Sequence, residues 1–206
     1  MRGGIDEVGR GCLVGPMIFC LVSSRDQEAE EKLRSLGVKD SKLIKDPIVM
    51  KNIAKYIKKS FDVKFIEGSP ELIDHYVNYS SLNELSLELV KSILSDDIKE
   101  VCIDSLGNSE RYLVELQKEF KKMNIEILEK AESKDPFCAA ASICAKDRRN
   151  DLLKEINLSH KVGSGYPSDP ILKKFISENL ESIRRKELNF IRYSWKSVSH
   201  YLDTKE

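Results

Sequence analysis

The chain has 206 residues, of which 41% are hydrophobic and 33% are charged, and its 34 basic residues balance 34 acidic ones. This composition is typical of a soluble globular protein, and the sequence contains no apolar run of transmembrane length. The balance of charges disfavours nucleic-acid binding through bulk positive charge. The five cysteines include no Cys-x-x-Cys pair. That disfavours a structural zinc site or a disulfide framework, so we expect free thiols and a cytoplasmic protein.

Two apolar runs joined by a glycine-rich turn open the chain and are predicted to be strands. A short charged helix and a loop follow, and then Asp46-Pro47 opens a second helix as an N-cap with proline in the first turn. Alternating apolar residues predict a third strand. The predicted strands to this point are 2–6, 17–23 and 61–67, and the predicted helices are 28–35, 47–59, a short one from 69, and 81–94.

In the rest of the chain, strands alternate with helices. This order predicts an α/β domain with a mixed sheet, antiparallel at its start and parallel later. We expect one main domain over residues 1–179 and a small helical extension over 180–206 packed on it. The predicted strands here are 99–104 and 125–128, and the predicted helices are 109–122, 139–156, one from 170, and charged pieces to the end.

Four carboxylates stand in distinctive local sequences: Asp6 and Glu7 where the first strand ends, Asp104 at the end of VCID, and Glu132 in KAESK. Ionised acids repel one another, so a fold that gathers several of them normally does so to bind divalent cations. A pair of such ions is a common means of cleaving phosphodiesters with water. The pattern therefore favours a metal-dependent nuclease.

Each acid also has an ordinary structural explanation. Asp6 and Glu7 could simply close a strand, Asp104 could begin a helix, and Glu132 or Asp135 could interact with a helix N-terminus. However, carboxylates at the ends of strands in an α/β sheet converge on one edge, which favours the joint interpretation.

With these motifs placed in order, the chain resembles type 2 ribonuclease H, or ribonuclease HII, in the compact form typical of archaea. The resemblance spans nearly the whole length. It rests on residues 4–11 (GIDEVGRG), 38–42 (VKDSK), 104, 108–112 (NSERY), 130–136 (KAESKDP), 140–146 (AASICAK), 163–170 (GSGYPSDP) and 194–196 (SWK).

The resemblance implies a ribonuclease H-like five-stranded mixed sheet flanked by helices, with a small C-terminal helical appendage. The implied activity is cleavage of the RNA strand in RNA/DNA hybrids, and cleavage 5′ of ribonucleotides embedded in duplex DNA, which leaves 3′-hydroxyl and 5′-phosphate ends. Such an enzyme serves ribonucleotide removal, DNA replication and repair. Two divalent ions, Mg²⁺ or Mn²⁺, would be held by the catalytic acids Asp6, Glu7, Asp104 and Glu132.

By the same resemblance, the Gly-Arg-Gly turn and a loop tyrosine would recognise the 2′-hydroxyl that distinguishes RNA from DNA. Three basic side chains are candidate phosphate contacts, although exposed lysine and arginine are usually only solvated surface. The implied substrate-binding residues are Gly9, Arg10, Gly11, Lys42, Lys146, Arg149 and Tyr166. A monomer without membrane contact is expected, and a sliding-clamp partner cannot be inferred from the sequence.

The chain departs from the family pattern in three places. Glu132 stands where the family usually has aspartate, and Asp135 is a second acid within reach, so the fourth ligand stays open between them. Lys42 is followed by Leu43 instead of a second lysine, and Asn150 replaces an acid. The alternatives are a ribonuclease HIII-type enzyme, another nuclease of this fold such as a junction resolvase, and a non-catalytic nucleic-acid-binding module.

Overall fold

A five-stranded sheet with the strand order β3-β2-β1-β4-β5 organises the chain. The structure is a computed structural model that describes residues 1–203 except 39–43, 45 and 106. The predicted loop residue Lys42 therefore lies outside the described residues. The strands are β1 (Arg2–Val8), β2 (Met17–Ser24), β3 (Asp62–Gly68), β4 (Glu100–Asp104) and β5 (Asn124–Leu128).

The sheet is mixed, as the sequence predicts. Strand β1 pairs antiparallel with β2 and parallel with β4, and β4 pairs parallel with β5. Strand β1 continues to Val8, past its predicted end at Asp6, because its pairing with β2 continues to Val8 and Ile18. Seven successive residues of β2 are buried, which explains its unbroken apolar sequence.

Most predicted helices form, and their caps follow from the sequence. Asp46, Ser69 and Asp169 each accept a backbone hydrogen bond from the first turn of a helix that begins with proline. No helix in the described part of the chain is long and apolar enough to cross a membrane. The helices are α1 (Ala29–Ser35), α2 (Pro47–Ser60), α3 (Pro70–Tyr79), α4 (Leu82–Ile93), α5 (Ser109–Glu119), the 3-10 turn η2 (Ala131–Ser133), α6 (Pro136–His160), α7 (Pro170–Glu178), α8 (Leu180–Arg184) and α9 (Lys196–Asp203).

The helix boundaries that differ most from the prediction are those of α6 and the end of α5, and α6 continues to His160, past its predicted end at 156. Helix α6 begins at Pro136 instead of Ala139 because the Asp135 side chain caps it, accepting a hydrogen bond of 2.9 Å from the backbone N–H of Cys138. Helix α5 ends at Glu119 instead of Lys122, and a turn bond from the Met123 N–H to the Phe120 carbonyl follows it.

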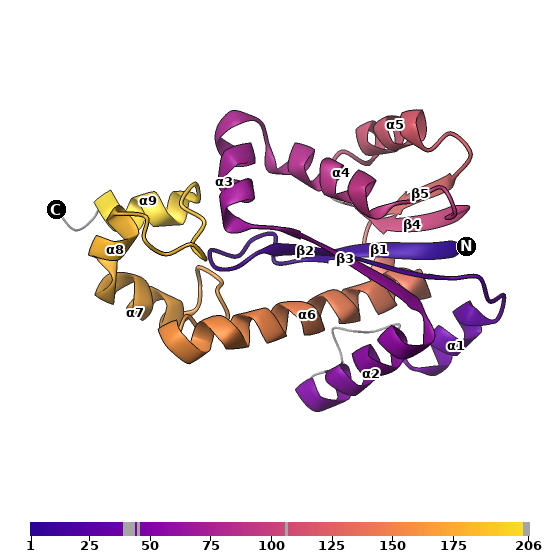
Figure 1. The fold of residues 1–206 in the computed structure, drawn as a ribbon, viewed down its shortest axis with the longest axis horizontal. Coiled ribbons are helices and arrows are strands. Elements are labelled where there is room, and N and C mark those ends of the chain that lie inside the picture. The colour runs from indigo at the N-terminus through magenta and orange to yellow at the C-terminus, as the bar shows by residue number, and fades with distance from the viewer. Residues whose placement is uncertain (39–43, 45, 106, 204–206) are drawn as a thin grey trace. The chain divides into compact units, whose positions relative to one another are not determined.

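The chain divides into two compact units. The first, here called the sheet unit, comprises Met1–Val8, Ile18–Ile66 and Ser86–Arg148. Within it, α4 and α5 lie over one face of the sheet, and α1, α2 and the first half of α6 lie over the other (Figure 1). The side chains of β2, of the central residues of β4 and of the first turns of α6 form the core between these layers.

The sheet unit depends on a close contact between β1 and the start of α6. A Cβ atom placed on Gly4 would lie 2.3 Å from the backbone nitrogen of Cys138 and 2.7 Å from the Cβ of Phe137. Only glycine lets the helix approach the strand so closely. Because α6 meets β1 in this way, residues further along the helix can reach the carboxyl end of the strand.

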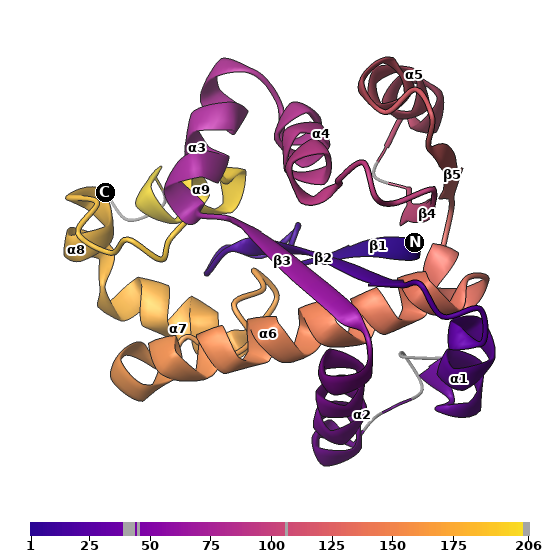
Figure 2. The same ribbon diagram turned by 45° about the vertical axis from the view of Figure 1, so that its right-hand side comes forward.

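The second unit, here called the helical unit, comprises Gly9–Met17, Glu67–Leu85 and Arg149–Glu206. Figure 2 shows α7 following the end of α6 within it, with α8 and α9 beyond. The fully buried Arg192 donates to the carbonyls of Gly15 at 2.9 Å and Arg10 at 3.0 Å. The buried apolar core of this unit is Leu13, Val14, Leu153, Val162, Leu172, Phe175, Ile176, Ile183, Ile191 and Val198.

Replacing Gly4 by alanine is expected to destabilise the protein by about 3 kcal/mol or more, because the added methyl group meets backbone atoms that cannot rotate away. Urea unfolding followed by circular dichroism would measure the loss. The matched control is Gly11→Ala, where a Cβ meets nothing within 4 Å. Equal unfolding free energies for the two variants would contradict this account of the contact.

Candidate active site

Parallel pairing brings Asp6 and Asp104 to the same edge of the sheet. Ile5 of β1 is in register with Ile103 of β4, so the next residue of each strand lies at the carboxyl end of adjacent strands. The Asp6 side chain is almost fully buried there. The convergence that the sequence predicts for these two acids is therefore present in the fold.

Glu132 joins this edge through the segment before α6. The backbone N–H of Ala131 donates to Asp104 Oδ1 at 2.7 Å, which fixes the start of η2 against the end of β4. Glu132 Oε2 accepts a hydrogen bond of 3.1 Å from the Ser142 hydroxyl of α6. The same Glu132 oxygen lies 3.7 Å from the ammonium group of Lys146, which is one helical turn after Ser142 on α6. The structure thus links Glu132 to the acids of β1 and β4.

Glu7 lies within β1, directly after Asp6, and is half-buried, with its Oε2 atom shielded from solvent. Its backbone N–H donates to Asp6 Oδ1 at 2.7 Å. Neighbouring residues of a strand point to opposite faces, so Glu7 and Asp6 approach the sheet edge from different sides. The negative charge of Glu7 is nevertheless close enough to act on Asp6.

The charge state of Asp6 reflects this crowded, dry position. Burial raises the pKa of Asp6 to about 7, and repulsion from Asp104 and Glu7 acts in the same direction. Hydrogen bonds from Ser142 and from the Glu7 backbone lower the pKa, but by less. A buried carboxylate among other carboxylates is stabilised by a nearby cation. Four carboxylates offer only hard oxygen ligands, which suit Mg²⁺ or Mn²⁺.

Asp135, the other acid considered for the fourth position, is occupied by structural contacts. Its Oδ1 caps α6, and its Oδ2 lies 2.9 Å from Arg2 Nη2. Arg2 also pairs with Glu30 and lies 3.4 Å from Glu100, so it ties β1 to α1 and β4. These contacts explain an acid at position 135 without any ligand role.

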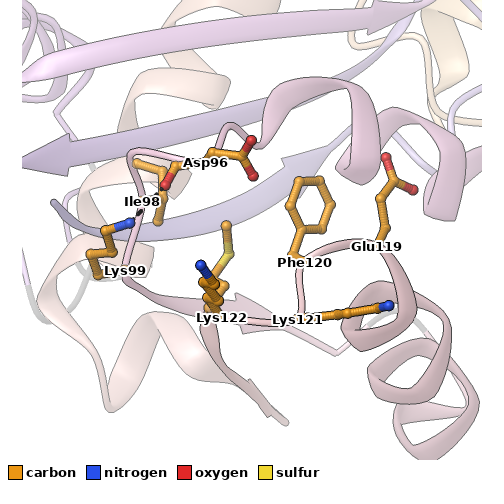
Figure 3. Close-up of a pocket in the computed structure, with 8 residues that line it drawn as sticks. Asp96, Ile98, Lys99, Glu119, Phe120, Lys121 and Lys122 are labelled. Atoms are coloured by element: carbon orange, nitrogen blue, oxygen red, sulfur yellow. Dashed lines mark hydrogen bonds between the residues drawn. The ribbon is translucent and has the colours of Figure 1, made fainter.

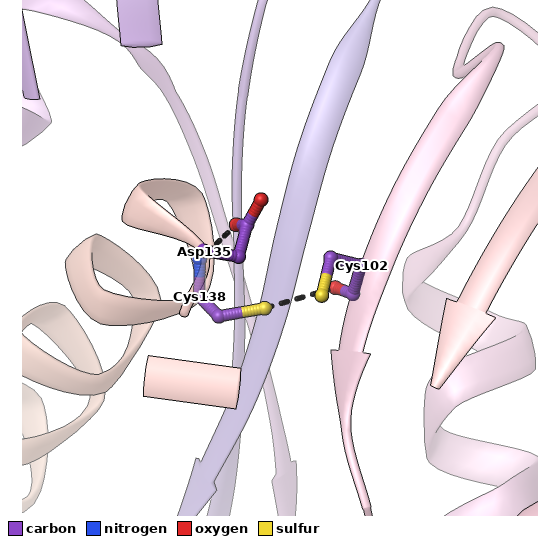
Figure 4. A group of neighbouring side chains, drawn as sticks. All are labelled: Cys102, Asp135 and Cys138. Atoms are coloured by element: carbon purple, nitrogen blue, oxygen red, sulfur yellow. Dashed lines mark hydrogen bonds between the residues drawn. The ribbon is translucent and has the colours of Figure 1, made fainter. Parts of the chain in front are cut away.

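A second group of potential metal-binding side chains lies beside this cap. Ligand atoms of Cys102, Asp135 and Cys138 lie within 4.8 Å of one another (Figure 4). However, the Cys138 thiol donates to the Cys102 carbonyl at 3.2 Å, and burial raises the pKa of this thiol well above its usual value. Without a metal, the thiol is therefore protonated, and these side chains pack between β4 and α6.

The Gly-Arg-Gly turn and the tyrosine loop meet within the helical unit. Gly9 has φ of 86°, in the region that favours glycine, and a Cβ there would lie 2.9 Å from the Pro16 carbonyl oxygen. After the turn, the backbone N–H of Leu13 donates to the carbonyl of Gly165 at 2.8 Å. This bond fixes the turn beside the loop that carries Tyr166.

Arg149 forms hydrogen bonds with both of these segments. Its Nη2 donates to the Ser164 carbonyl at 2.7 Å and to Cys12 Sγ at 2.9 Å. Its guanidinium lies 5.2 Å from the centre of the Tyr166 ring. Arg149 is 6% exposed whereas Tyr166 is 39% exposed, so the arginine holds the tyrosine at the surface. Its predicted contact with phosphate stays a prediction.

Two of these roles have only weak signals in the sequence. Ser142 is a polar residue in an apolar helical run and lies four residues before Lys146, which places both on one helix face. Arg149 follows a second arginine, and nothing in the local sequence tells which of the two is buried. Both roles depend on segments that are distant in the chain.

A separate pocket of about 390 Å³ opens at the other end of β4 and β5. Figure 3 shows side chains of its wall from the segment before β4 and from the end of α5 onward: Asp96, Ile98, Lys99, Glu119, Phe120, Lys121 and Lys122. Its lining mixes lysines with acids and apolar side chains, which selects no particular ligand. None of the predicted site residues that the structure describes lines this pocket.

Comparisons with known proteins identify the family of this chain and agree with its fold. The family model described as ribonuclease HII matches residues 3–198. The ribonuclease HII of Nanoarchaeum equitans is 35% identical over 94% of this chain and 92% of its own length. Among solved structures, the ribonuclease HII of Archaeoglobus fulgidus, in a complex with PCNA, has a TM-score of 0.87 at 32% identity and covers 98% of this chain and 96% of its own. Ribonuclease H2 of Pyrococcus horikoshii has a TM-score of 0.88 at 26% identity, covering 98% of this chain and 97% of its own.

The raised pKa of Asp6 predicts a pH-dependent stability in the absence of metal. Folding favours the protonated acid, so the free energy of unfolding should fall as pH rises from about 4 to about 7, by as much as about 4 kcal/mol. Urea unfolding across this pH range in the presence of EDTA would measure the fall. Asp6→Asn should remove most of this slope, and Mg²⁺ should reverse the loss near neutral pH. Identical slopes for the wild type and Asp6→Asn would contradict the assignment.

Proposed function

Because this chain belongs to the ribonuclease HII family and is an endoribonuclease, we propose that it cleaves the RNA strand of RNA/DNA hybrids and cuts 5′ of ribonucleotides embedded in duplex DNA. The products would carry 3′-hydroxyl and 5′-phosphate ends. The observation that supports this proposal best is the convergence of Asp6, Asp104 and Glu132 at one sheet edge, with a buried aspartate of raised pKa among them. In the cell, this activity would serve ribonucleotide removal in DNA replication and repair.

We propose that Asp6, Glu7, Asp104 and Glu132 hold two divalent ions, Mg²⁺ or Mn²⁺. When bound, such a pair supplies a water of lowered pKa as nucleophile and stabilises charge on the leaving 3′-oxygen. The carboxylates act as ligands, and the protein keeps them in place through the Ala131 N–H on Asp104 and the Ser142 hydroxyl on Glu132.

Substrate recognition is proposed for the turn formed by Gly9, Arg10 and Gly11 together with Tyr166. A Cβ at Gly11 would meet nothing within 4 Å, so a sugar could approach the backbone there closely. Tyr166 would bond the 2′-hydroxyl and stack on the next sugar, supported by Arg149. Lys42 and Lys146 are proposed to contact phosphates.

The alternatives are less well supported. A non-catalytic module has no need to gather carboxylates at the cost of a raised pKa, and a junction resolvase has no need for the Gly-Arg-Gly and tyrosine pair. A ribonuclease HIII-type enzyme shares the fold, but the family model that matches this chain is that of ribonuclease HII.

Several further features of the enzyme are proposed on the same basis. Residues 1–179 would form the catalytic domain, and 180–206 would be an extension packed on it, as the shared core of Ile183 and Val198 with Phe175 suggests.

Since the Archaeoglobus relative is described in a complex with PCNA, we propose that a sliding clamp also binds this chain. The enzyme would act as a monomer in the cytoplasm, where its five cysteines, all buried, stay reduced.

The test of the function is cleavage of duplexes that contain zero, one or several ribonucleotides, with Mg²⁺, Mn²⁺ or EDTA. Asp104→Asn is expected to lower the rate by about a thousandfold or more, because a metal ligand loses its charge. The amide oxygen can still accept the Ala131 N–H, so the fold should be kept. Near wild-type turnover by a folded variant would refute the assignment of Asp104.

The fourth ligand is tested by comparing Glu132→Gln with Asp135→Asn across a metal titration. Glu132→Gln should raise the metal concentration required for cleavage. Asp135→Asn should keep the helix cap, because its amide oxygen can still accept the Cys138 N–H, and should mainly lower the unfolding free energy by removing the Arg2 ion pair, by about 1–3 kcal/mol. If the metal requirement rises only for Asp135→Asn, then Asp135 is the ligand.

Tyr166→Ala is expected to slow cutting at a lone ribonucleotide by about thirtyfold to a thousandfold, and to slow cutting of a continuous hybrid less. In continuous RNA, several placements of the substrate can offset a poor one. Tyr166→Phe is the matched control, since it keeps the ring over Arg149 and removes only the hydroxyl. Cleavage rates on both substrates at equal salt concentration would test this role. An equal loss of rate on both would mean that Tyr166 only contributes to packing of the loop.

A further inference from the structure

Ser142 is a buried hydroxyl in an otherwise apolar stretch of α6. It is 1% exposed, and the residues on either side of it, Ala139–Ala141 and Ile143–Ala145, are fully buried. A hydroxyl in such surroundings is costly unless it is hydrogen-bonded. Its partners therefore indicate why a polar residue is placed there.

Those partners are two carboxylates from different parts of the chain. The Ser142 hydroxyl donates to Glu132 Oε2 at 3.1 Å, and it also interacts with Asp6, whose pKa it lowers. Its single proton serves one of the two carboxylates at a time. Glu132 comes from η2, and Asp6 from the end of β1. One hydroxyl on a well-packed helix thus connects two acids that repel each other when both are ionised.

Lys146 contributes to the same group in a different way. Its ammonium lies 3.7 Å from the Glu132 oxygen that Ser142 contacts, one turn further along α6. The lysine is partly exposed and long, so it balances charge without fixing direction. Ser142 is short and buried, with its oxygen held close to the helix backbone, so it sets where the carboxylates point.

We propose that Ser142 is a positioning residue for metal binding, whose hydroxyl holds the Asp6 and Glu132 carboxylates at the separation at which divalent ions bind. It acts through these two acids and touches neither ion nor substrate. The inference rests on the proposed metal-dependent function, and it assigns to α6 the task of ordering ligands that belong to β1 and η2.

The test is Mn²⁺ binding to the substrate-free full chain, measured by isothermal titration calorimetry. Ser142→Ala is expected to weaken Mn²⁺ binding by about tenfold to a hundredfold, the usual effect of losing a residue that orients metal ligands. The metal concentration for half-maximal cleavage should rise by the same factor, while the rate at saturating metal stays within about threefold. Ser23→Ala removes a buried hydroxyl from β2 and is expected to change neither quantity.

Each result decides the matter. If the wild type binds Mn²⁺ and Ser142→Ala binds it equally well, the positioning role is wrong and the proposed function stands. If the wild type binds no divalent ion, both are wrong. A lower rate at saturating metal with unchanged affinity would also overturn the role, since Ser142 would then act on the reaction itself. Ser142→Thr keeps a hydroxyl and should restore wild-type affinity; a tenfold loss in this variant, if folded, would overturn the inference even where Ser142→Ala is too unstable to measure.

Discussion

The direct contact of α6 with β1 at Gly4 is the constraint on which the candidate active site depends. With no side chain between them, the first turn of the helix lies against the strand backbone. That approach carries Ser142 to the end of β1, where Asp6 lies, and the Asp135 cap fixes where the helix starts. The parallel pairing of β1 with β4 then adds Asp104. Strand, helix and cap together determine the geometry of the acids.

Gathering these acids has an energetic cost that the rest of the sheet unit offsets. Burial and repulsion raise the pKa of Asp6, so near neutral pH the metal-free protein loses stability when Asp6 ionises. The large buried core around β2 supplies the opposing free energy. Natural proteins commonly keep such destabilised sites because activity requires them. The stability of the tightly packed sheet therefore allows the protein to keep carboxylates that repel one another close together.

The sequence predicts the fold well because its signals are local. Apolar alternation, Asp-Pro and Ser-Pro caps and the acid at the end of β4 each act within a few residues, so the strands and most helices could be placed. The acids of β1 and β4 could be grouped because parallel strands end at a common edge. The roles of Ser142 and Arg149, and the ion pair of Asp135 with Arg2, could not be read, since each depends on partners brought together only by tertiary packing. A buried arginine and an exposed one look alike in sequence.

The buried Arg192 has a consequence for how the protein is synthesised. Its guanidinium donates to the carbonyls of Gly15 and Arg10, 177 and 182 residues earlier in the chain. The turn around Arg10 is therefore synthesised long before the side chain that anchors it. A nascent chain or a truncated product that lacks residue 192 therefore carries an unanchored Gly-Arg-Gly turn. Only synthesis through residue 192 thus completes the anchoring of the segment proposed to recognise RNA.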